Sequence, residues 1–324
     1  MQLALDKAKT AKQAHPNPKV GCVIHLEGQA PIVACHEKYG QAHAEVNAFK
    51  AAEAKGFFSI SNKVNVYVTL EPCYHQGKTP ACLNLFKQYK NHINKVFIAC
   101  KDPNPKVSGQ SINELHQLFP EVNIGILEKE AEELNKEWMQ AQKQGFPYIR
   151  LKMATSLDFK FFSESGQSKW ITNPACREHA KINLRQNSDA LLTSYQTIKK
   201  DNPKYHGLET IIIHSSKMTS LNEIPEDYHI HQKKIHFINN KDDLKKLLTE
   251  KSIINLLIEA GPKLTNHYIQ NNLFNKIWHY QAPIILGGNQ APLKAFNSGD
   301  LPGLKLSFKS HQLIDGNWLN VFER

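Results

Sequence analysis

One histidine, two cysteines and one glutamate in the first half of the chain suit a catalytic metal site in type and spacing. The cysteines are Cys73 and Cys82 in the segment TLEPCYHQGKTPAC, and His43 and Glu45 belong to an earlier His-Ala-Glu tripeptide. One imidazole and two thiolates leave the fourth position of a tetrahedral zinc ion open to water, whereas structural zinc sites use four protein ligands. We therefore expect one zinc ion per chain, bound by His43, Cys73 and Cys82.

Glu45 is expected to transfer protons at this site. It lies two residues from His43, so its carboxylate can approach the metal without being a ligand. From there it can take a proton from activated water and pass it to a leaving amine. The pattern resembles the H-x-E…P-C-x-x-C signature of zinc nucleoside and nucleobase deaminases. However, eight residues separate Cys73 from Cys82, which counts against cytidine and transfer-RNA adenosine deaminases.

Alternating strand and helix patterns position these residues. Apolar runs predict strands over 20–26, 31–35, 64–70, 95–100 and 122–127, and helical patterns cover 43–56 and 128–144. Gly56 should end the first helix in a left-handed conformation. Thr79 and Pro80 are predicted as the N-cap and first residue of another helix. Cys82 would then lie in a first helical turn, where the helix dipole lowers a thiol pKa.

The second half again alternates strand and helix patterns, after a break at Gly145-Phe146-Pro147. We therefore expect two domains, 1–145 and 146–324. Strands are predicted over 148–154, 189–193, 210–214, 234–239 and 254–260, and helices near 174–185 and after Gly261. Alternation of this kind predicts α/β sheets covered by helices in both halves. Gly261 follows a buried strand and opens a helix, a position that suits a phosphate group.

The first half resembles the deaminase half of the bifunctional riboflavin-biosynthesis deaminase/reductase family. The motifs PNPKVGCVI, HAEVNA, TLEPCYHQGKTPAC and DPNPKVSG occur in the order of that family, which also has the long cysteine spacing. The resemblance implies a cytidine-deaminase-like three-layer α/β/α domain. It also implies zinc-dependent deamination of 2,5-diamino-6-ribosylamino-4(3H)-pyrimidinone 5′-phosphate. The family positions that contact the substrate fall on Asn17, His36, His75, Lys78 and Asn104.

The second half resembles the reductase partner of the same family, which has a dihydrofolate-reductase-like α/β fold. Matching segments include YIRLKMATSLD, SGQSKWIT, LRQNSDALLTSYQTIKKDNP, IEAGPKL and APIILGG. The resemblance implies hydride transfer from NADPH to C1′ of the ribosyl group, giving 5-amino-6-ribitylamino-uracil 5′-phosphate. Cofactor positions fall on Ala154, Trp170, Thr197, Asp201, Ser215, Gly261, Pro262, Lys263, Leu264, Thr265, Asn266 and His267. Substrate positions fall on Ser168, Arg185, Tyr205 and Glu259, of which Arg185 is a natural phosphate partner.

The second half departs from the family in three places. Phe159 replaces the usual glycine of S-L-D-G, so that turn must differ or be strained. His214 ends a strand where the family commonly has aspartate. No arginine follows Pro203 in DNPKYHGLE, which leaves His206 or a lysine to meet the substrate phosphate. A deaminase with an inactive reductase-like domain is therefore an alternative.

The charge and hydrophobicity of the whole chain bear on which partners and which location to expect. Its 324 residues carry a formal charge of +10, but the lysines are scattered, which indicates a solvated surface. The residues also leave open a deaminase that acts on nucleic acid and a binding module stabilised by zinc. No run approaches the about 20 apolar residues of a membrane span, and the N-terminus lacks a signal-peptide pattern. We expect a cytoplasmic enzyme that acts on a phosphorylated pyrimidine and binds neither nucleic acid nor membrane; family resemblance implies a homodimer or homotetramer.

Overall fold

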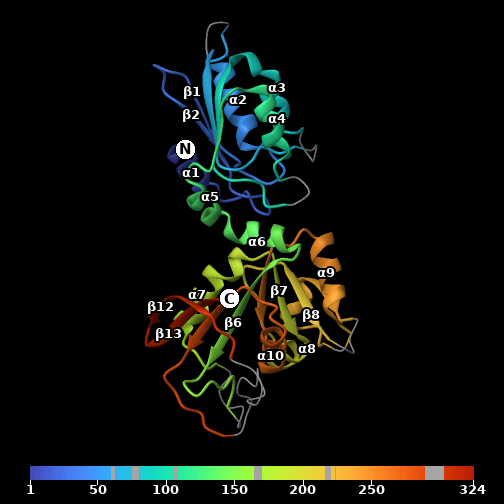
Figure 1. The fold of residues 1–324 in the computed structure, drawn as a ribbon. Coiled ribbons are helices and arrows are strands. Elements are labelled where there is room, and N and C mark those ends of the chain that lie inside the picture. Colours follow the sequence, from blue (N-terminus) through green and yellow to red (C-terminus); the bar gives the residue numbers. More distant parts are fainter. Residues whose placement is uncertain are drawn as a thin grey trace. The chain divides into compact units, whose positions relative to one another are not determined.

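The computed structural model describes residues 1–59, 63–74, 80–104, 108–163, 170–215, 220–222, 224–288 and 303–324. The chain divides into two compact units, Met1–Gly145 and Phe146–Arg324 (Figure 1). No helix among these residues is long and apolar enough to span a bilayer.

Unit 1 is built on a five-stranded sheet with the order β2-β1-β3-β4-β5. Strand β1 pairs antiparallel with β2 and β3, and the β3-β4 and β4-β5 pairs are parallel. The strands are β1 (Gly21–His25), β2 (Ile32–Cys35), β3 (Val64–Val68), β4 (Ile93–Ile98) and β5 (Val122–Ile124). The helices are α1 (Gln2–Lys9), α2 (Ala44–Ala54), α3 (Leu83–Gln88), η1 (Lys90–His92), α4 (Gln110–Leu118), α5 (Glu128–Leu134) and α6 (Lys136–Gln144).

Helices cover both faces of this sheet. Side chains of α2, α3 and α4 form one buried core with β1, β3 and β4, for example Phe49 and Phe86 with Val66. Residues of α1, α5 and α6 form a second buried cluster, which includes Leu5 and Ala131. The expected three-layer α/β/α arrangement is therefore confirmed.

Two details of the expected helices are wrong. The helix predicted over 128–144 is interrupted at Asn135, whose amide accepts from the Lys19 backbone N–H at 2.8 Å and donates to the Lys19 carbonyl at 2.9 Å. The helix predicted from Pro80 begins only at Leu83. The backbone N–H groups of Cys82 and Leu83 bond to the Sγ and carbonyl oxygen of Cys73, so this segment is held by the preceding turn. Thr79 lies outside the described residues.

Unit 2 contains an eight-stranded sheet with the order β12-β13-β11-β6-β10-β7-β8-β9. Strands β11, β6, β10, β7, β8 and β9 are parallel, and β13 pairs antiparallel with β11 and β12. The strands are β6 (Tyr148–Thr155), β7 (Ala190–Ser194), β8 (Thr210–His214), β9 (Lys234–Ile238), β10 (Asn255–Glu259), β11 (Lys276–Gln281), β12 (Ser307–Ile314) and β13 (Asn317–Glu323). The helices are α7 (Pro174–Asn183), η2 (Arg185–Asn187), α8 (Tyr195–Asp201), η3 (His229–Gln232), α9 (Lys241–Glu250) and α10 (Pro262–Gln270).

The two faces of this sheet carry separate cores. Residues of α9 and α10, such as Leu244 and Leu264, pack on one face, and residues of α7 and α8, such as Ala180 and Ile198, pack on the other. Since the parallel strands end at the same edge, the segments after β6, β7, β8 and β10 gather there. This edge, defined by Thr155, Ser194, His214 and Glu259, is called the carboxyl edge below.

Gly21 provides a test of the packing in unit 1. A Cβ built on Gly21 would lie 1.9 Å from the carbonyl oxygen of Ala4 in α1, and a backbone atom cannot move aside easily. We expect Gly21→Ala to destabilise the protein by about 1–3 kcal/mol, as overpacked cores do. The measurement is chemical denaturation of the full chain. Gly303→Ala is the matched control, because its Cβ would meet nothing within 4 Å; equal stability of the two variants would contradict the close packing of α1.

Candidate metal centre and candidate cofactor-binding edge

His43, Cys73 and Cys82 come together although they lie far apart in sequence. His43 is the N-cap residue of α2, Cys73 follows β3, and Cys82 precedes α3. The Nδ1 atom of His43 lies 3.6 Å from Cys73 Sγ and 3.3 Å from Cys82 Sγ, and all three ligand atoms lie within 4.8 Å of one another. In a tetrahedral zinc site, bond lengths near 2.0 and 2.3 Å place N and S ligands about 3.5 Å apart. The three side chains therefore fit a zinc ion.

The two thiols are not equivalent. Hydrogen bonds from the Cys82 thiol and from His43 lower the pKa of Cys73 to about 4, although burial acts in the opposite direction. The pKa of Cys82 is raised, because its thiol donates to Cys73 and is buried. The lowering of the Cys82 pKa that we expected from the helix dipole is outweighed here. The short helix α3 starts after Cys82, and the neighbouring sulfur has the larger effect.

Glu45 lies in the first turn of α2 beside the three ligands and is only 3% exposed. Burial raises its pKa to about 7, and the negative charge of Cys73 acts in the same direction. Its carboxylate also forms a hydrogen bond with the Cys82 thiol. Glu45 is therefore a carboxylate held against the cluster in a place that suits proton transfer.

Two of the expected substrate residues lie next to the cluster. The His36 ring is 5.3 Å from the His43 ring. His36 Nδ1 lies 3.0 Å from the Ala42 carbonyl, and its Nε2 lies 3.1 Å from the Asn17 amide nitrogen. These distances assign the proton to Nδ1, so that Nε2 accepts from Asn17.

For the other three expected substrate residues, the structure gives little about their position relative to the cluster. The backbone N–H of Asn104 donates to Asp102 Oδ1 at 2.8 Å in the segment after β4. His75 and Lys78 lie outside the described residues.

Glu71 has a structural role that the sequence did not reveal. It is 4% exposed, and its carboxylate accepts hydrogen bonds from the backbone N–H groups of Asp102 (3.1 Å), Gly109 (2.9 Å) and Ile112 (3.4 Å). These bonds connect the turn that carries Cys73 to the start of α4. The acidic residue in Glu-Pro-Cys was visible in the sequence, but its partners lie more than thirty positions away.

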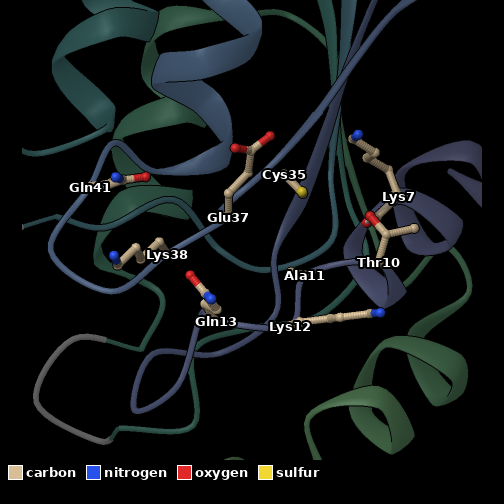
Figure 2. A pocket seen from close by; sticks show the side chains of 9 residues that line it. All are labelled: Lys7, Thr10, Ala11, Lys12, Gln13, Cys35, Glu37, Lys38 and Gln41. Carbon is tan, nitrogen blue, oxygen red and sulfur yellow. Dashed lines mark hydrogen bonds between the residues drawn. The ribbon is translucent and has the colours of Figure 1, made fainter.

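A separate cavity of about 430 Å³ lies beside α1 and the end of β2 (Figure 2). Its lining contains none of the three candidate zinc ligands and consists of Lys7, Thr10, Ala11, Lys12, Gln13, Cys35, Glu37, Lys38 and Gln41. Cys35 contributes to this lining, whereas the next residue, His36, packs against His43. The cavity is therefore distinct from the metal centre.

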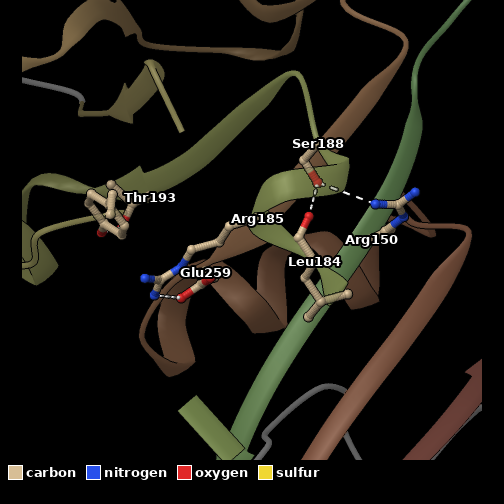
Figure 3. A network of polar contacts seen from close by, with 7 residues as sticks. Arg150, Leu184, Arg185, Ser188, Thr193 and Glu259 are labelled. Atoms are coloured by element: carbon tan, nitrogen blue, oxygen red, sulfur yellow. Dashed lines mark hydrogen bonds and ion pairs between the residues drawn. The ribbon is translucent and has the colours of Figure 1, made fainter. Parts of the chain in front are cut away.

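In unit 2, three of the expected substrate residues meet near the carboxyl edge. Arg185 donates to both carboxylate oxygens of Glu259 at 2.7 and 2.8 Å (Figure 3). The guanidinium lies 5.4 Å from the Tyr205 ring, and the Tyr205 hydroxyl donates to Thr193. Burial would raise the pKa of Glu259, but the charge and hydrogen bonds of Arg185 lower it to about 2. Arg185 was expected to meet a phosphate, yet two of its donors are occupied by Glu259; Ser168 lies outside the described residues.

Lys152 is a second residue that the sequence did not single out. It lies on β6 directly opposite Glu259 of β10 in the parallel register. Burial lowers the pKa of its ammonium group, while the charge of Glu259 raises it. A lysine with these neighbours can hold or release a proton beside the expected substrate residues.

The expected cofactor residues also lie around the carboxyl edge. Ala154 is on β6, Ser215 follows β8, and Gly261 follows β10. Thr197 and Asp201 belong to α8, which starts where β7 ends. Trp170 is 54% exposed, with the Arg177 guanidinium 4.7 Å from its ring.

The start of α10 fits a phosphate group. No side chain caps this helix, and a Cβ built on Gly261 would meet nothing within 4 Å. The backbone N–H groups of its first turn are therefore accessible to an anion. Within the same run, the buried Asn266 Oδ1 has no hydrogen-bond partner. These features suit NADPH, whose pyrophosphate needs such donors.

The turn that contains Phe159 retains the backbone conformation of a glycine. Phe159 has φ of +59°, and its ring stacks on that of His279 at 5.5 Å while remaining 47% exposed. The preceding Asp158 accepts from the Ser156 hydroxyl (2.6 Å) and from the N–H groups of Leu286 (3.1 Å) and Gly287 (2.9 Å). The turn is therefore held by its neighbours in a strained conformation, which is one of the two outcomes that the sequence predicted.

Comparisons with known proteins cover the whole chain. Residues 147–319 match the RibD C-terminal domain, and residues 1–100 match the cytidine and deoxycytidylate deaminase zinc-binding region. The riboflavin biosynthesis protein RibD of Bacillus amyloliquefaciens is 33% identical, with 95% of this chain and 91% of the relative aligned. RibD of Escherichia coli is 32% identical, with 90% of this chain and 87% of the relative aligned.

Solved structures of similar proteins also match the chain over nearly its whole length. RibD of Acinetobacter baumannii is 31% identical and superposes with a TM-score of 0.79, over 99% of this chain and 97% of that one. A second similar structure, from Thermotoga maritima, is a diaminohydroxyphosphoribosylaminopyrimidine deaminase/5-amino-6-(5-phosphoribosylamino)uracil reductase. It is 25% identical and has a TM-score of 0.79, over 100% of this chain and 97% of that one.

Glu71 provides a test of how the metal centre is supported. Glu71→Ala would leave three backbone N–H groups without their acceptor, so we expect a loss of about 2–4 kcal/mol of unfolding free energy. Glu121→Ala is the control, because its ion pair with Lys95 lies at the exposed surface, where such pairs contribute little to stability. Denaturant titration of both variants measures the difference, and a Glu71 variant as stable as the control would disprove the role.

Phe159 provides a test of backbone strain. At φ of +59° a side chain costs about 1–2 kcal/mol relative to glycine. Phe159→Gly should therefore have a higher melting temperature than Phe159→Ala, since both lose the ring but only glycine relieves the strain. An alanine variant that melts at the same temperature as the glycine variant would show that the turn is not strained.

Proposed function

The chain belongs to the RibD family of riboflavin biosynthesis proteins, and we propose that unit 1 carries out its deaminase reaction and unit 2 its reductase reaction. The protein is then a bifunctional enzyme of riboflavin biosynthesis. Its first substrate is 2,5-diamino-6-ribosylamino-4(3H)-pyrimidinone 5′-phosphate, and its final product is 5-amino-6-ribitylamino-uracil 5′-phosphate. The observation that carries this proposal is the group of His43, Cys73 and Cys82, with the buried Glu45 beside it.

The metal centre accounts for the deamination. His43, Cys73 and Cys82 would hold the zinc ion through one nitrogen and two sulfur atoms. A bound zinc ion acts as a Lewis acid that makes a water molecule more acidic, which is the chemistry that hydrolytic deamination needs. Glu45 would accept the proton from that water and donate it to the departing amino group, which leaves as ammonia.

Asn17 and His36 would help to position the pyrimidine. They form a hydrogen-bonded pair beside His43, so they present polar atoms to a ring bound at the cluster. His75, Lys78 and Asn104 are proposed as further substrate contacts by resemblance alone.

The carboxyl edge of unit 2 accounts for the reduction. NADPH supplies a hydride to C1′ of the sugar when it is bound. Ala154, Trp170, Thr197, Asp201, Ser215 and the run from Gly261 to His267 would hold the cofactor. Arg185 keeps Glu259 ionised and fixed, and the Lys152 ammonium faces that carboxylate, so a proton can be held beside the reacting sugar.

The surroundings of the enzyme are also part of the proposal. A phosphorylated small molecule is the natural partner of the two sites, and we place the enzyme in the cytoplasm. By resemblance we expect a homodimer or homotetramer, which analytical ultracentrifugation can measure.

Glu45→Gln tests the proton transfer. The amide is nearly isosteric but cannot accept the proton, so we expect zinc content to remain near one ion per chain while the deamination rate falls about 100-fold or more. Zinc is measured by atomic absorption and ammonia release by a coupled assay. Deamination at the normal rate would show that another group moves the proton.

Removal of zinc tests whether the two sites are separate. The His43, Cys73 and Cys82 group lies in unit 1 and the Arg185 and Glu259 pair lies in unit 2. We expect a chelator to stop ammonia release and to leave NADPH oxidation with the deaminated intermediate within about twofold, because structural zinc is not expected in unit 2. No NADPH oxidation by the untreated enzyme would rule out the reductase assignment.

A further inference from the structure

A tyrosine of the unit 2 sheet lies beside Lys152. On β11, Trp278 is paired with Lys152 of β6, and Tyr280 lies two residues further along the same face. The Lys152 Nζ atom lies over the Tyr280 ring, 5.9 Å from its centroid. A cation within about 6 Å of the centre of an aromatic face is attracted by the electrons of the ring. The Tyr280 ring therefore stabilises Lys152 in its charged form.

The ring acts on Lys152 as a neutral group. Tyr280 is fully buried, and its hydroxyl lies 3.0 Å from Nδ1 of His179 on α7. Burial raises the pKa of Tyr280, and the negative charge of Glu259 raises it further. The tyrosine therefore stays protonated near neutral pH. What it offers to the ammonium group is the face of its ring, which the hydrogen bond with His179 holds in place.

The other charged groups around Lys152 act in opposite directions. Burial lowers the pKa of its ammonium group, the negative charge of Glu259 raises it, and the positive charge of Arg185 lowers it. From α7, Cys176 raises this pKa and Arg177 lowers it. Arg185 also donates to both carboxylate oxygens of Glu259, so one anion serves two cations. The ammonium group therefore depends on the ring for part of the stabilisation of its charge.

We propose that Tyr280 is a positioning residue of the reductase site, whose ring keeps the Lys152 ammonium charged and directed at Glu259. This inference deepens the proposed function of unit 2 and rests on it. A group that supplies a proton must carry that proton before the step, so the rate falls at high pH where the ammonium group loses it. Since the ring favours the charged form, loss of the ring lowers the pKa of Lys152 and moves this fall in rate to lower pH.

Variants of Tyr280 test the proposal through the rate of NADPH oxidation with the deaminated intermediate. Tyr280→Leu removes the ring, so we expect the alkaline midpoint of the kcat profile to move down by about half a pH unit to one unit. Tyr280→Phe loses the hydroxyl but keeps the ring, so its midpoint should stay at the wild-type pH. A merely structural role would lower kcat in both variants without moving the midpoint. An unmoved midpoint in Tyr280→Leu would overturn the proposal.

A fluorinated ring keeps the test decisive if the leucine variant does not fold. A trifluorinated phenylalanine in place of Tyr280 has nearly the volume of phenylalanine, but its fluorine atoms withdraw electrons from the face of the ring. We expect its alkaline midpoint to lie at lower pH than that of Tyr280→Phe, with the same melting temperature. Equal midpoints in these two proteins would show that the ring electrons do not support Lys152.

Labelling of Lys152 separates this inference from the reductase function. Competitive acetylation at a series of pH values, followed by peptide mass spectrometry, gives the pKa of its amine in the full chain without turnover. This pKa should be lower in Tyr280→Leu than in Tyr280→Phe. The internal control is Lys276, which lies 5.7 Å from the centre of another ring, that of Trp278, and should react equally in both variants.

The two measurements together distinguish the possible failures. If the Lys152 pKa falls as expected but the wild-type chain oxidises no NADPH, the proposed function fails and the inference stands. If the wild-type chain oxidises NADPH but the Lys152 pKa is the same in Tyr280→Leu and Tyr280→Phe, the inference fails and the function stands.

Discussion

The charge of a buried carboxylate must be stabilised by hydrogen bonds or by a cation. In this protein the kind of partner decides what each buried carboxylate can do. Glu71 accepts three backbone hydrogen bonds, so it stays fixed and supports the turn that carries Cys73. Glu259 is paired at two points with Arg185, so it stays ionised. Glu45 has no cation that fully offsets its burial, and its pKa rises to about 7. An uncompensated buried charge is costly, so of these three carboxylates Glu45 is the one in a state that suits proton exchange.

The fold of both units places polar groups where the proposed chemistry needs them. Backbone N–H groups at helix starts lack partners within the helix, and ligands bind outside the carboxyl ends of the strands in such sheets. In unit 1 the starts of α2 and α3 carry His43 and Cys82, and in unit 2 the start of α10 follows β10. The strained turn at Phe159 belongs to this pattern, because Asp158 fixes it with backbone N–H groups of Leu286 and Gly287.

Much of the fold was predictable because it depends on local pattern. Runs of β-branched residues gave strands such as β3 and β8, and Gly56 ends its helix with φ of +73° as expected. The break at Asn135 and the late start of α3 were not predictable, since each depends on hydrogen bonds to a distant segment. Glu71 and Lys152 were missed for the same reason: their partners are set by the packing of the chain and not by neighbours in sequence.

The sequence by itself determined the identity of the groups that could do chemistry. A histidine, two cysteines and a glutamate at these spacings indicate hydrolytic zinc chemistry, because residue type and ligand number restrict what a metal can do. Only the tertiary structure decided that the two thiols share a hydrogen bond beside His43, which carboxylate can exchange a proton, and that Arg185 binds Glu259. These outcomes depend on burial and on distances of a few ångströms, which arise when segments far apart in the sequence are packed together.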